Sequence, residues 1–259
     1  MTMKNGSADC AICGAKLEYL DNAEAIPCTY CGTSGASRSR CPAGHFMCDA
    51  CNDGDAMTII EAVSLSASTG DPISLAELMM NHPNLPMLGC EHALIAAGAL
   101  MAALKNSPYG KGKIGDQEIR ESLERAGKQV VDGSCALTGV CGISPAIGAC
   151  FSIFLGVHRG SDREQRITME AVSRVSQTLA GMTGPSCCKA YVRASLMEAV
   201  TIFGERFGIA LPVGNNRITC RHSEKHPHGC REVECPYFEK PAKDIFAEMK
   251  FVPGTVCTT

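Results

Sequence analysis

Closely spaced cysteines near the N-terminus form a pattern that binds metal ions. Two intervening residues let a pair of cysteines place both thiolates on one ion, and a tetrahedral ion takes two such pairs. The chain offers eight ligands of this kind, enough for two four-ligand sites, and the spacing leaves sequential and interleaved pairing both open. The eight candidate metal ligands are Cys10, Cys13, Cys28, Cys31, Cys41, His45, Cys48 and Cys51.

Zinc is the metal expected at these sites, although iron–sulfur clusters also use thiolate ligands. A site closed by four protein ligands leaves no position for a substrate, so we predict a structural role. Residues 1–55 are polar and turn-rich and contain little apolar surface. A segment of this composition usually folds only when its metal is bound.

A second set of cysteines stands mainly at glycine-rich turns that precede predicted helices, where a ligand can approach the backbone closely. Three thiolates can hold a [4Fe-4S] cluster, or a zinc ion, with one position open for substrate. Cys150, which lies inside an apolar helix, is instead expected to be a core residue. The candidate cofactor-binding residues are Cys90, Cys135, Cys141, Cys187 and Cys188.

Cys187 and Cys188 are adjacent and follow Ser186, which is predicted to cap the next helix. The helix dipole and the charges of Lys189 and Arg193 would then lower the pKa of both thiols. The pair is therefore either a reactive dithiol or two ligands of a cluster. The alternative is that both thiols simply fill the core.

Several of these residues are also candidates for catalysis. Glu91 and His92 can move protons, although His92 has the alternative of a buried core histidine. Lys189 can hold an anionic group of the substrate, and the deprotonated thiols are nucleophiles. The candidate catalytic residues are Cys187, Cys188, Lys189, His92 and Glu91.

The C-terminal segment contains three cysteines and three histidines in residues 220–235. Such tracts are typical of metal binding. Cys220, Cys230 and Cys235 are the candidate ligands of a third site, completed by a histidine of the segment or by a cysteine from elsewhere. The alternative is a histidine-rich surface loop with incidental thiols.

Helices are the elements that must position these groups, because alternating β-branched runs are scarce. The predicted fold class is mainly α, with a helical domain at 56–212. A small zinc-ribbon-like, cysteine-rich module at 1–55 precedes this domain, and a Cys/His-rich metal-binding tail at 213–259 follows it. Ser74 and Glu77 predict a capping box at the start of one helix. Helices are predicted at 57–67, 75–81, 91–105, 116–129, 144–157, 162–180 and 186–207, with a short one at 242–249.

Composition excludes several classes of protein. The 259 residues carry 24 Lys and Arg against 27 Asp and Glu, a net charge of −3, which disfavours a nucleic-acid binder. No run approaches the roughly 18 apolar residues of a membrane span, and the N-terminus lacks the apolar stretch of a signal peptide. We therefore expect a cytoplasmic protein without membrane contact, whose 17 cysteines are ligands or reactive thiols rather than disulfides.

Motifs spread over nearly the whole chain resemble a cysteine-rich family of unknown function (domain of unknown function 5714). The family occurs in archaea and anaerobic bacteria, in some cases beside radical-SAM or methyltransferase domains. The resemblance implies a metalloprotein of anaerobic metabolism and no particular activity. The motifs are Cys41-x2-Gly44-His45-x2-Cys48-Asp49-x-Cys51, Cys90-Glu91-His92, Cys135-Ala136 with Gly139-x-Cys141-Gly142, Gly184-Pro185-x-Cys187-Cys188-Lys189 and Glu234-Cys235-Pro236-x-Phe238.

Residues 139–150 also have a weaker similarity to the iron–sulfur domain of bacterial serine dehydratases. Those proteins place cysteines at glycine-rich turns before small-residue helices. The similarity implies an open iron site that carries out β-elimination.

Two functions are consistent with these features. The first is an iron–sulfur or zinc enzyme that handles sulfur or one-carbon chemistry through cysteines of the helical domain. The second is a non-enzymatic carrier of metal or clusters, an electron-transfer protein or an assembly factor, which docks a partner enzyme. The expected partner is a small molecule or a protein of anaerobic metabolism, and the Ala- and Gly-rich helices indicate close packing within the chain or in a homodimer.

Overall fold

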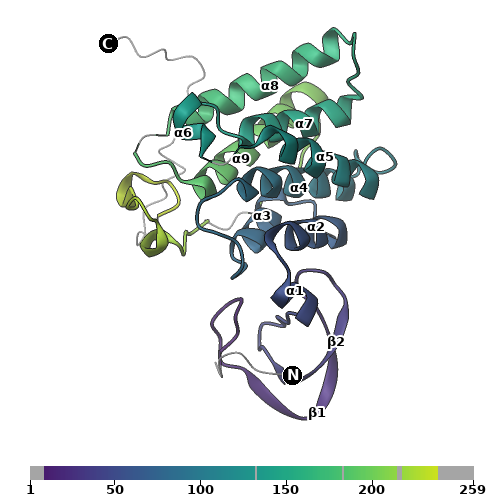
Figure 1. Cartoon of the computed structure of the whole chain (residues 1–259). Coiled ribbons are helices and arrows are strands. Elements are labelled where there is room, and N and C mark those ends of the chain that lie inside the picture. The colour runs from purple at the N-terminus through teal and green to yellow at the C-terminus, as the bar shows by residue number, and fades with distance from the viewer. Residues whose placement is uncertain (1–8, 132, 183, 215–217, 239–259) are drawn as a thin grey trace.

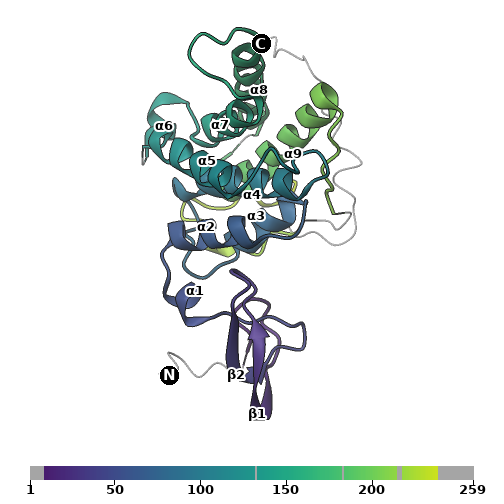
Figure 2. The same ribbon diagram turned by 90° about the vertical axis from the view of Figure 1, so that its right-hand side faces the viewer.

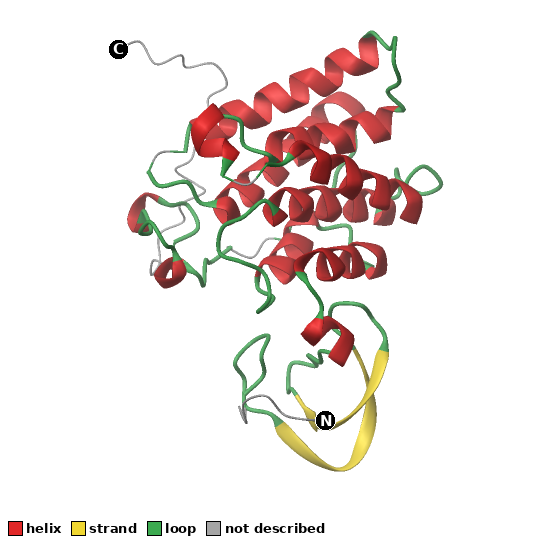
Figure 3. Cartoon of the chain, in the orientation of Figure 1, coloured by secondary structure: helices red, strands yellow, loops and turns green. Residues whose placement is uncertain are grey.

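The computed structural model describes residues 9–131, 133–182, 184–214 and 218–238. Helix-forming residues dominate the chain from residue 56 onward. The helix predicted at 242–249 lies outside the described residues. Figure 3 shows helices over most of the chain and strands confined to its N-terminal part. The elements are β1 (Glu18–Pro27), β2 (Ser34–Arg40), α1 (Asp49–Asp53), α2 (Ala56–Ser66), α3 (Pro72–Met80), α4 (Glu91–Asn106), α5 (Asp116–Gln129), α6 (Ser134–Thr138), α7 (Ile143–Leu155), α8 (Arg163–Ala180) and α9 (Cys188–Phe207), followed by the 3-10 turns Ser223–Lys225 and Glu232–Glu234. The prediction of a mainly α protein with a zinc-ribbon-like module and a Cys/His-rich tail is confirmed.

Helix α4 forms the centre of the helical domain (α2–α9) because nearly all of its side chains are apolar. Every residue from His92 to Leu104 is buried, and α2, α3, α5, α7 and α9 all contact this helix. Small residues bring the neighbouring helices close: a Cβ on Gly98 would lie 2.3 Å from the Oγ of Ser64 in α2. Helix α8 packs outside, against α7 and α9 (Figures 1 and 2).

The start of α3 differs from the prediction. The carboxylate of Asp71 caps this helix by accepting hydrogen bonds from the backbone N–H groups of Ile73 and Ser74. Pro72 then occupies the first helical turn, where its fixed φ and missing N–H are well tolerated. The predicted capping box that begins at Ser74 is therefore wrong, because the hydroxyl of Ser74 donates to Asp71 instead.

The N-terminal module (residues 9–53) is built on an antiparallel hairpin, in which Glu18 pairs with Arg40 and Pro27 pairs with Ser34. Both strands are largely exposed, so the hairpin has almost no apolar core of its own. Tyr30 ties the module to the helical domain: its ring packs edge-on against His82 at 4.6 Å, and its carbonyl accepts a hydrogen bond from Ser66. The module lies at one end of the molecule (Figures 1 and 2).

The C-terminal segment (residues 218–238) folds back onto the helical domain. Its two ends are held together by a hydrogen bond of 2.7 Å from the N–H of Cys220 to the carbonyl of Tyr237. The segment docks on α3 and α9, since His222 bonds Asn81 at 2.9 Å and Arg193 lies over the ring of Tyr237. Among the described residues, no helix has both the length and the apolar run that a bilayer crossing requires.

Candidate metal centres

The eight N-terminal ligands form two interleaved sites. The sulfur atoms of Cys13 and Cys41 are 3.6 Å apart, and so are those of Cys31 and Cys48. Four thiolates that each lie about 2.3 Å from a tetrahedral zinc ion stand about 3.8 Å from one another. Both groups therefore have the dimensions of a site for one ion such as zinc. The groups are Cys10, Cys13, Cys41 and His45, and Cys28, Cys31, Cys48 and Cys51, with all ligand atoms of each group within 4.8 Å of one another.

The antiparallel hairpin is the reason for the interleaving. Cys13 precedes β1 and Cys41 follows β2, so the pairing of the strands brings these two ligands together at the open end of the hairpin. Cys28 and Cys31 lie in the turn between the strands, where they meet the two cysteines at the start of α1. Sequential sites would require ligands at opposite ends of the hairpin to share one ion.

Paired substitutions distinguish the two arrangements. A Cys10→Ala/Cys41→Ala variant is expected to lose one zinc ion per chain, because both ligands belong to the same site. A Cys10→Ala/Cys28→Ala variant removes a ligand from each site and is expected to lose two. Atomic emission on protein dialysed in trace zinc measures the difference. Sequential pairing predicts the opposite result for the two variants.

A cavity of about 570 Å³, here called the large cavity, lies where the N-terminal ends of α4, α7 and α9 meet. Four cysteines from three segments of the chain line it. Cys90 is the N-cap of α4, Cys188 is the first residue of α9, Cys135 lies in α6, and Cys141 precedes α7. These thiols affect one another: burial raises the pKa of Cys141, and the charges of Cys135 and Cys90 raise it further.

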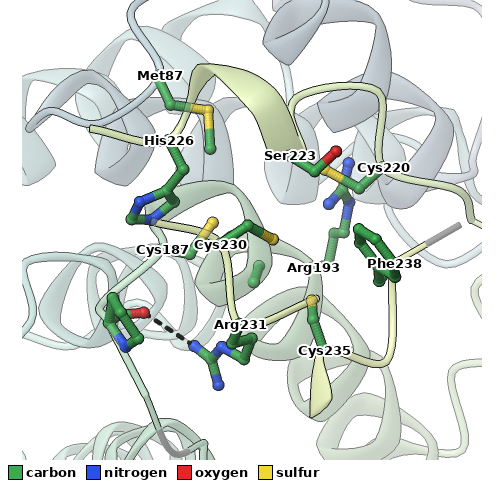
Figure 4. A pocket seen from close by; sticks show the side chains of 12 residues that line it. Met87, Cys187, Arg193, Cys220, Ser223, His226, Cys230, Arg231, Cys235 and Phe238 are labelled. Carbon is green, nitrogen blue, oxygen red and sulfur yellow. Dashed lines mark hydrogen bonds between the residues drawn. The ribbon is translucent and has the colours of Figure 1, made fainter. Parts of the chain in front are cut away.

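A second cavity, the small cavity, lies between α9 and the C-terminal segment and also has four cysteines in its wall (Figure 4). Cys187 comes from the start of α9, whereas Cys220, Cys230 and Cys235 come from the C-terminal segment. Neither cavity has three ligand atoms within 4.8 Å of one another, so among the described residues that close spacing is found only in the N-terminal module.

The adjacent cysteines thus line different cavities. Cys187 is the N-cap of α9 and has an extended backbone, whereas Cys188 begins the helix, so their side chains leave the backbone in different directions. The prediction of Ser186 as the N-cap is wrong by one residue. The expected lowering of both thiol pKa values is also wrong for the metal-free protein, because burial raises the pKa of Cys187 and raises that of Cys188 to about 11.

A family model matches residues 60–238, and its description is "Family of unknown function (DUF5714)". The chain belongs to this family. Searches among curated proteins and among solved structures gave no match. The matched residues include both cavities and all eight cysteines that line them, whereas the N-terminal module lies outside the match.

In this DUF5714 chain, three of the candidate catalytic residues lie outside the walls of both cavities. Lys189 is buried, and its Nζ donates to the carbonyl of Met80 at 2.7 Å. His92 is fully buried and bonds the carbonyl of Gly89, and burial lowers its pKa to about 3, so its ring is neutral. Glu91 is the neighbour of His92 at the start of α4. The catalytic roles of all three remain predictions.

Sequence reasoning missed two features of the DUF5714 cavities. His228 of the C-terminal segment reaches the wall of the large cavity, although it lies far from Cys90 and Cys141 in the chain. Val130 and Val131, which follow α5, form part of the apolar wall of the same cavity. No local pattern marks such residues, because only the tertiary packing of α5 against α7 brings them to the site.

Proposed function

We propose that the chain is an iron–sulfur enzyme whose reaction takes place in the large cavity and concerns sulfur or one-carbon chemistry. The observation that carries the proposal is a cavity of about 570 Å³ walled by Cys90, Cys135, Cys141 and Cys188. This volume is in the range of cavities that bind small molecules. Three thiolates suffice to hold a cluster and leave one iron for a substrate.

The donor set fits an anionic cluster for a second reason. The N-terminal ends of α4, α7 and α9 all meet at this cavity, and each helix brings a partial positive charge there. The backbone N–H of Ile143 also donates to the sulfur of Cys141, and that of Gly89 donates to the sulfur of Cys188. Both effects stabilise thiolates bound to metal. A cluster bound here supplies a Lewis-acidic iron or a one-electron couple.

The wall of the large cavity indicates the class of substrate. Apart from the four thiols and His228, the described residues that line it are uncharged and mostly small or apolar, and none is Lys, Arg, Asp or Glu. A phosphate or carboxylate group would have no side-chain cation to bind. The cavity therefore suits a small uncharged compound with a thiol, thioether or methyl group. His228, exposed at the wall, is the group that can exchange a proton with solvent.

Metal and sulfide analysis tests the proposal. Protein purified without oxygen is expected to contain iron and acid-labile sulfide, and Cys141→Ala and Cys188→Ala are each expected to lose about four of each per chain. Cys150→Ala is the matched control, because Cys150 is buried in the same domain and lines neither cavity.

Substrate binding gives an independent readout. A small uncharged thiol or methylated sulfur compound is expected to change the electron paramagnetic resonance spectrum of the reduced protein, and Cys141→Ala is expected to remove this change. If neither variant loses iron, the proposed site is wrong. If iron is present but no such compound alters the spectrum, the non-enzymatic carrier replaces the enzyme.

A further inference from the structure

The small cavity brings together the ligands of a candidate metal centre. The sequence predicted three of these ligands and left the fourth open. Cys220, Cys230 and Cys235 lie around it, and the start of α9 contributes Cys187 as a fourth thiol. Figure 4 shows the four side chains gathered around one space between α9 and the C-terminal segment. Cys220 and Cys235 are nearly fully buried, and Cys187 and Cys230 are partly buried.

His222 and His226 are engaged by other groups and His228 lines the large cavity, so a cysteine is the better fourth ligand of the small cavity. The Nε2 of His226 bonds the carbonyl of Ser186 at 3.1 Å, and its Nδ1 accepts the N–H of His228. The Nε2 of His222 bonds the side chain of Asn81 at 2.9 Å. These contacts hold the segment against the helical domain and leave the thiols facing the cavity.

Backbone N–H groups point at all four sulfur atoms. The N–H two residues after each cysteine of the segment donates to its sulfur: His222 to Cys220 at 3.4 Å, Glu232 to Cys230 at 3.3 Å, and Tyr237 to Cys235. The N–H groups of Ala190 and Lys189 serve Cys187 in the same way. The same arrangement occurs in the N-terminal sites, where Thr33 donates to Cys31 and Ala43 donates to Cys41. Such hydrogen bonds stabilise sulfur as a thiolate ligand.

The spacing of the thiols separates this site from the N-terminal ones. The N-terminal sulfur atoms approach to 3.6 Å, which suits one tetrahedral ion. In the small cavity no three of the sulfur atoms lie within 4.8 Å of one another. A cubane cluster needs its thiolates farther apart than a single tetrahedral ion does, because each thiolate binds a different iron at a separate corner.

Two arginines lie in the wall of the small cavity, one of which, Arg193, also pairs with Glu77. Arg193 and Arg231 are part of its wall, and the buried Lys189 follows directly after the two adjacent cysteines. Four thiolates around a cluster leave a net negative charge, which is costly away from water unless cations or the N-terminal ends of helices lie nearby. The cations of the wall meet that requirement for a buried cluster.

We infer that Cys187, Cys220, Cys230 and Cys235 bind a second [4Fe-4S] cluster in the small cavity. The peptide bond between Cys187 and Cys188 then joins ligands of two centres, a consequence that rests on the proposed function of the large cavity. Two clusters linked in this way lie close enough for their unpaired spins to interact when both are reduced. The small cavity is closed by four ligands, so its cluster has no iron open to substrate.

Iron analysis and spectroscopy on the anaerobically purified full chain test the inference. The wild-type protein is expected to hold about eight iron atoms, and the Cys220→Ala/Cys235→Ala variant, which keeps only two of the four thiolates, about four. Cys187→Ala/Cys230→Ala is the second variant, since both residues are only partly buried and their loss perturbs the fold least. Cys150→Ala is the control that retains all iron. After reduction with dithionite, the wild-type spectrum is expected to show broadening from interacting spins, and both ligand variants a single-cluster signal.

Each outcome decides the inference. Unchanged iron in both double variants, or loss of zinc instead of iron, would falsify it. If these two variants lose iron but Cys141→Ala does not, the small cavity holds a cluster and the proposed function of the large cavity fails. The reverse result retains the proposed function and overturns this inference.

Discussion

Removal of zinc from the N-terminal module is expected to unfold residues 9–53 while the helical domain remains folded. The module has few buried residues, and four of the five are metal ligands. The fifth is Tyr30, which packs against the helical domain rather than within the hairpin. The buried residues are Cys10, Cys28, Tyr30, Cys41 and Cys51.

The expected effect is large because candidate metal ligands, and not apolar side chains, make up most of the buried residues of the module. The apparent binding free energy of structural zinc is about 10–16 kcal/mol in small zinc domains, and in such domains this energy is the folding energy. The ion pair between Arg40 and Glu18 is exposed, and such pairs add little stability. Without zinc, nothing in the hairpin offsets the conformational entropy of some 45 residues.

Limited trypsin digestion measures this outcome. Lys16, Arg38 and Arg40 lie in the module and are expected to be cut rapidly after chelation and slowly after zinc is restored. A Cys13→Ala/Cys31→Ala variant, which lacks one ligand of each site, is expected to be cut rapidly without chelator. Equal protection with and without zinc would show that contacts with the helical domain alone hold the module.

The local sequence pattern was enough to predict an element where one of its faces is buried and the other is exposed. Helix α5 was predicted at 116–129 and has these bounds in the structure, because its charged residues lie on one face and its buried ones on the other. The exposed hairpin was missed for the opposite reason: β1 and β2 are polar and have no alternating apolar run. Recognition of the hairpin would also have settled the interleaving of the N-terminal ligands.

The candidate centres show a second limit of sequence reasoning. The cysteine spacing identified the ligands of the N-terminal module because both members of each pair are neighbours in the chain. In the cavities the ligands come from separate segments, so only tertiary packing assigns Cys187 to one cavity and Cys188 to the other. A change of backbone conformation between two adjacent residues decides this assignment, and no sequence pattern encoded it.

Loss of the buried ion pair between Arg193 and Glu77 is expected to destabilise the helical domain strongly. The guanidinium is 1% exposed and forms two hydrogen bonds with the carboxylate, at 2.5 and 2.9 Å. Arg193→Met leaves the carboxylate of Glu77 largely buried without its partner. Removal of one member of a buried pair typically costs about 3–5 kcal/mol, and the partial exposure of Glu77 favours the lower end of about 3 kcal/mol.

Urea unfolding under anaerobic conditions, followed by circular dichroism, gives the shift in midpoint. Arg206→Ala is the matched control, because Arg206 pairs with Glu170 on the surface, where such pairs contribute at most about 1 kcal/mol.

Because Arg193 also lies in the wall of the small cavity, Glu77→Leu and the Arg193→Met/Glu77→Leu double variant complete the cycle. Glu77 lines neither cavity, so its variant separates loss of the ion pair from loss of the cluster. The double variant is expected to recover most of the stability, since both buried charges are gone. Additive losses would mean that Arg193 stabilises the fold through the small cavity and not through Glu77.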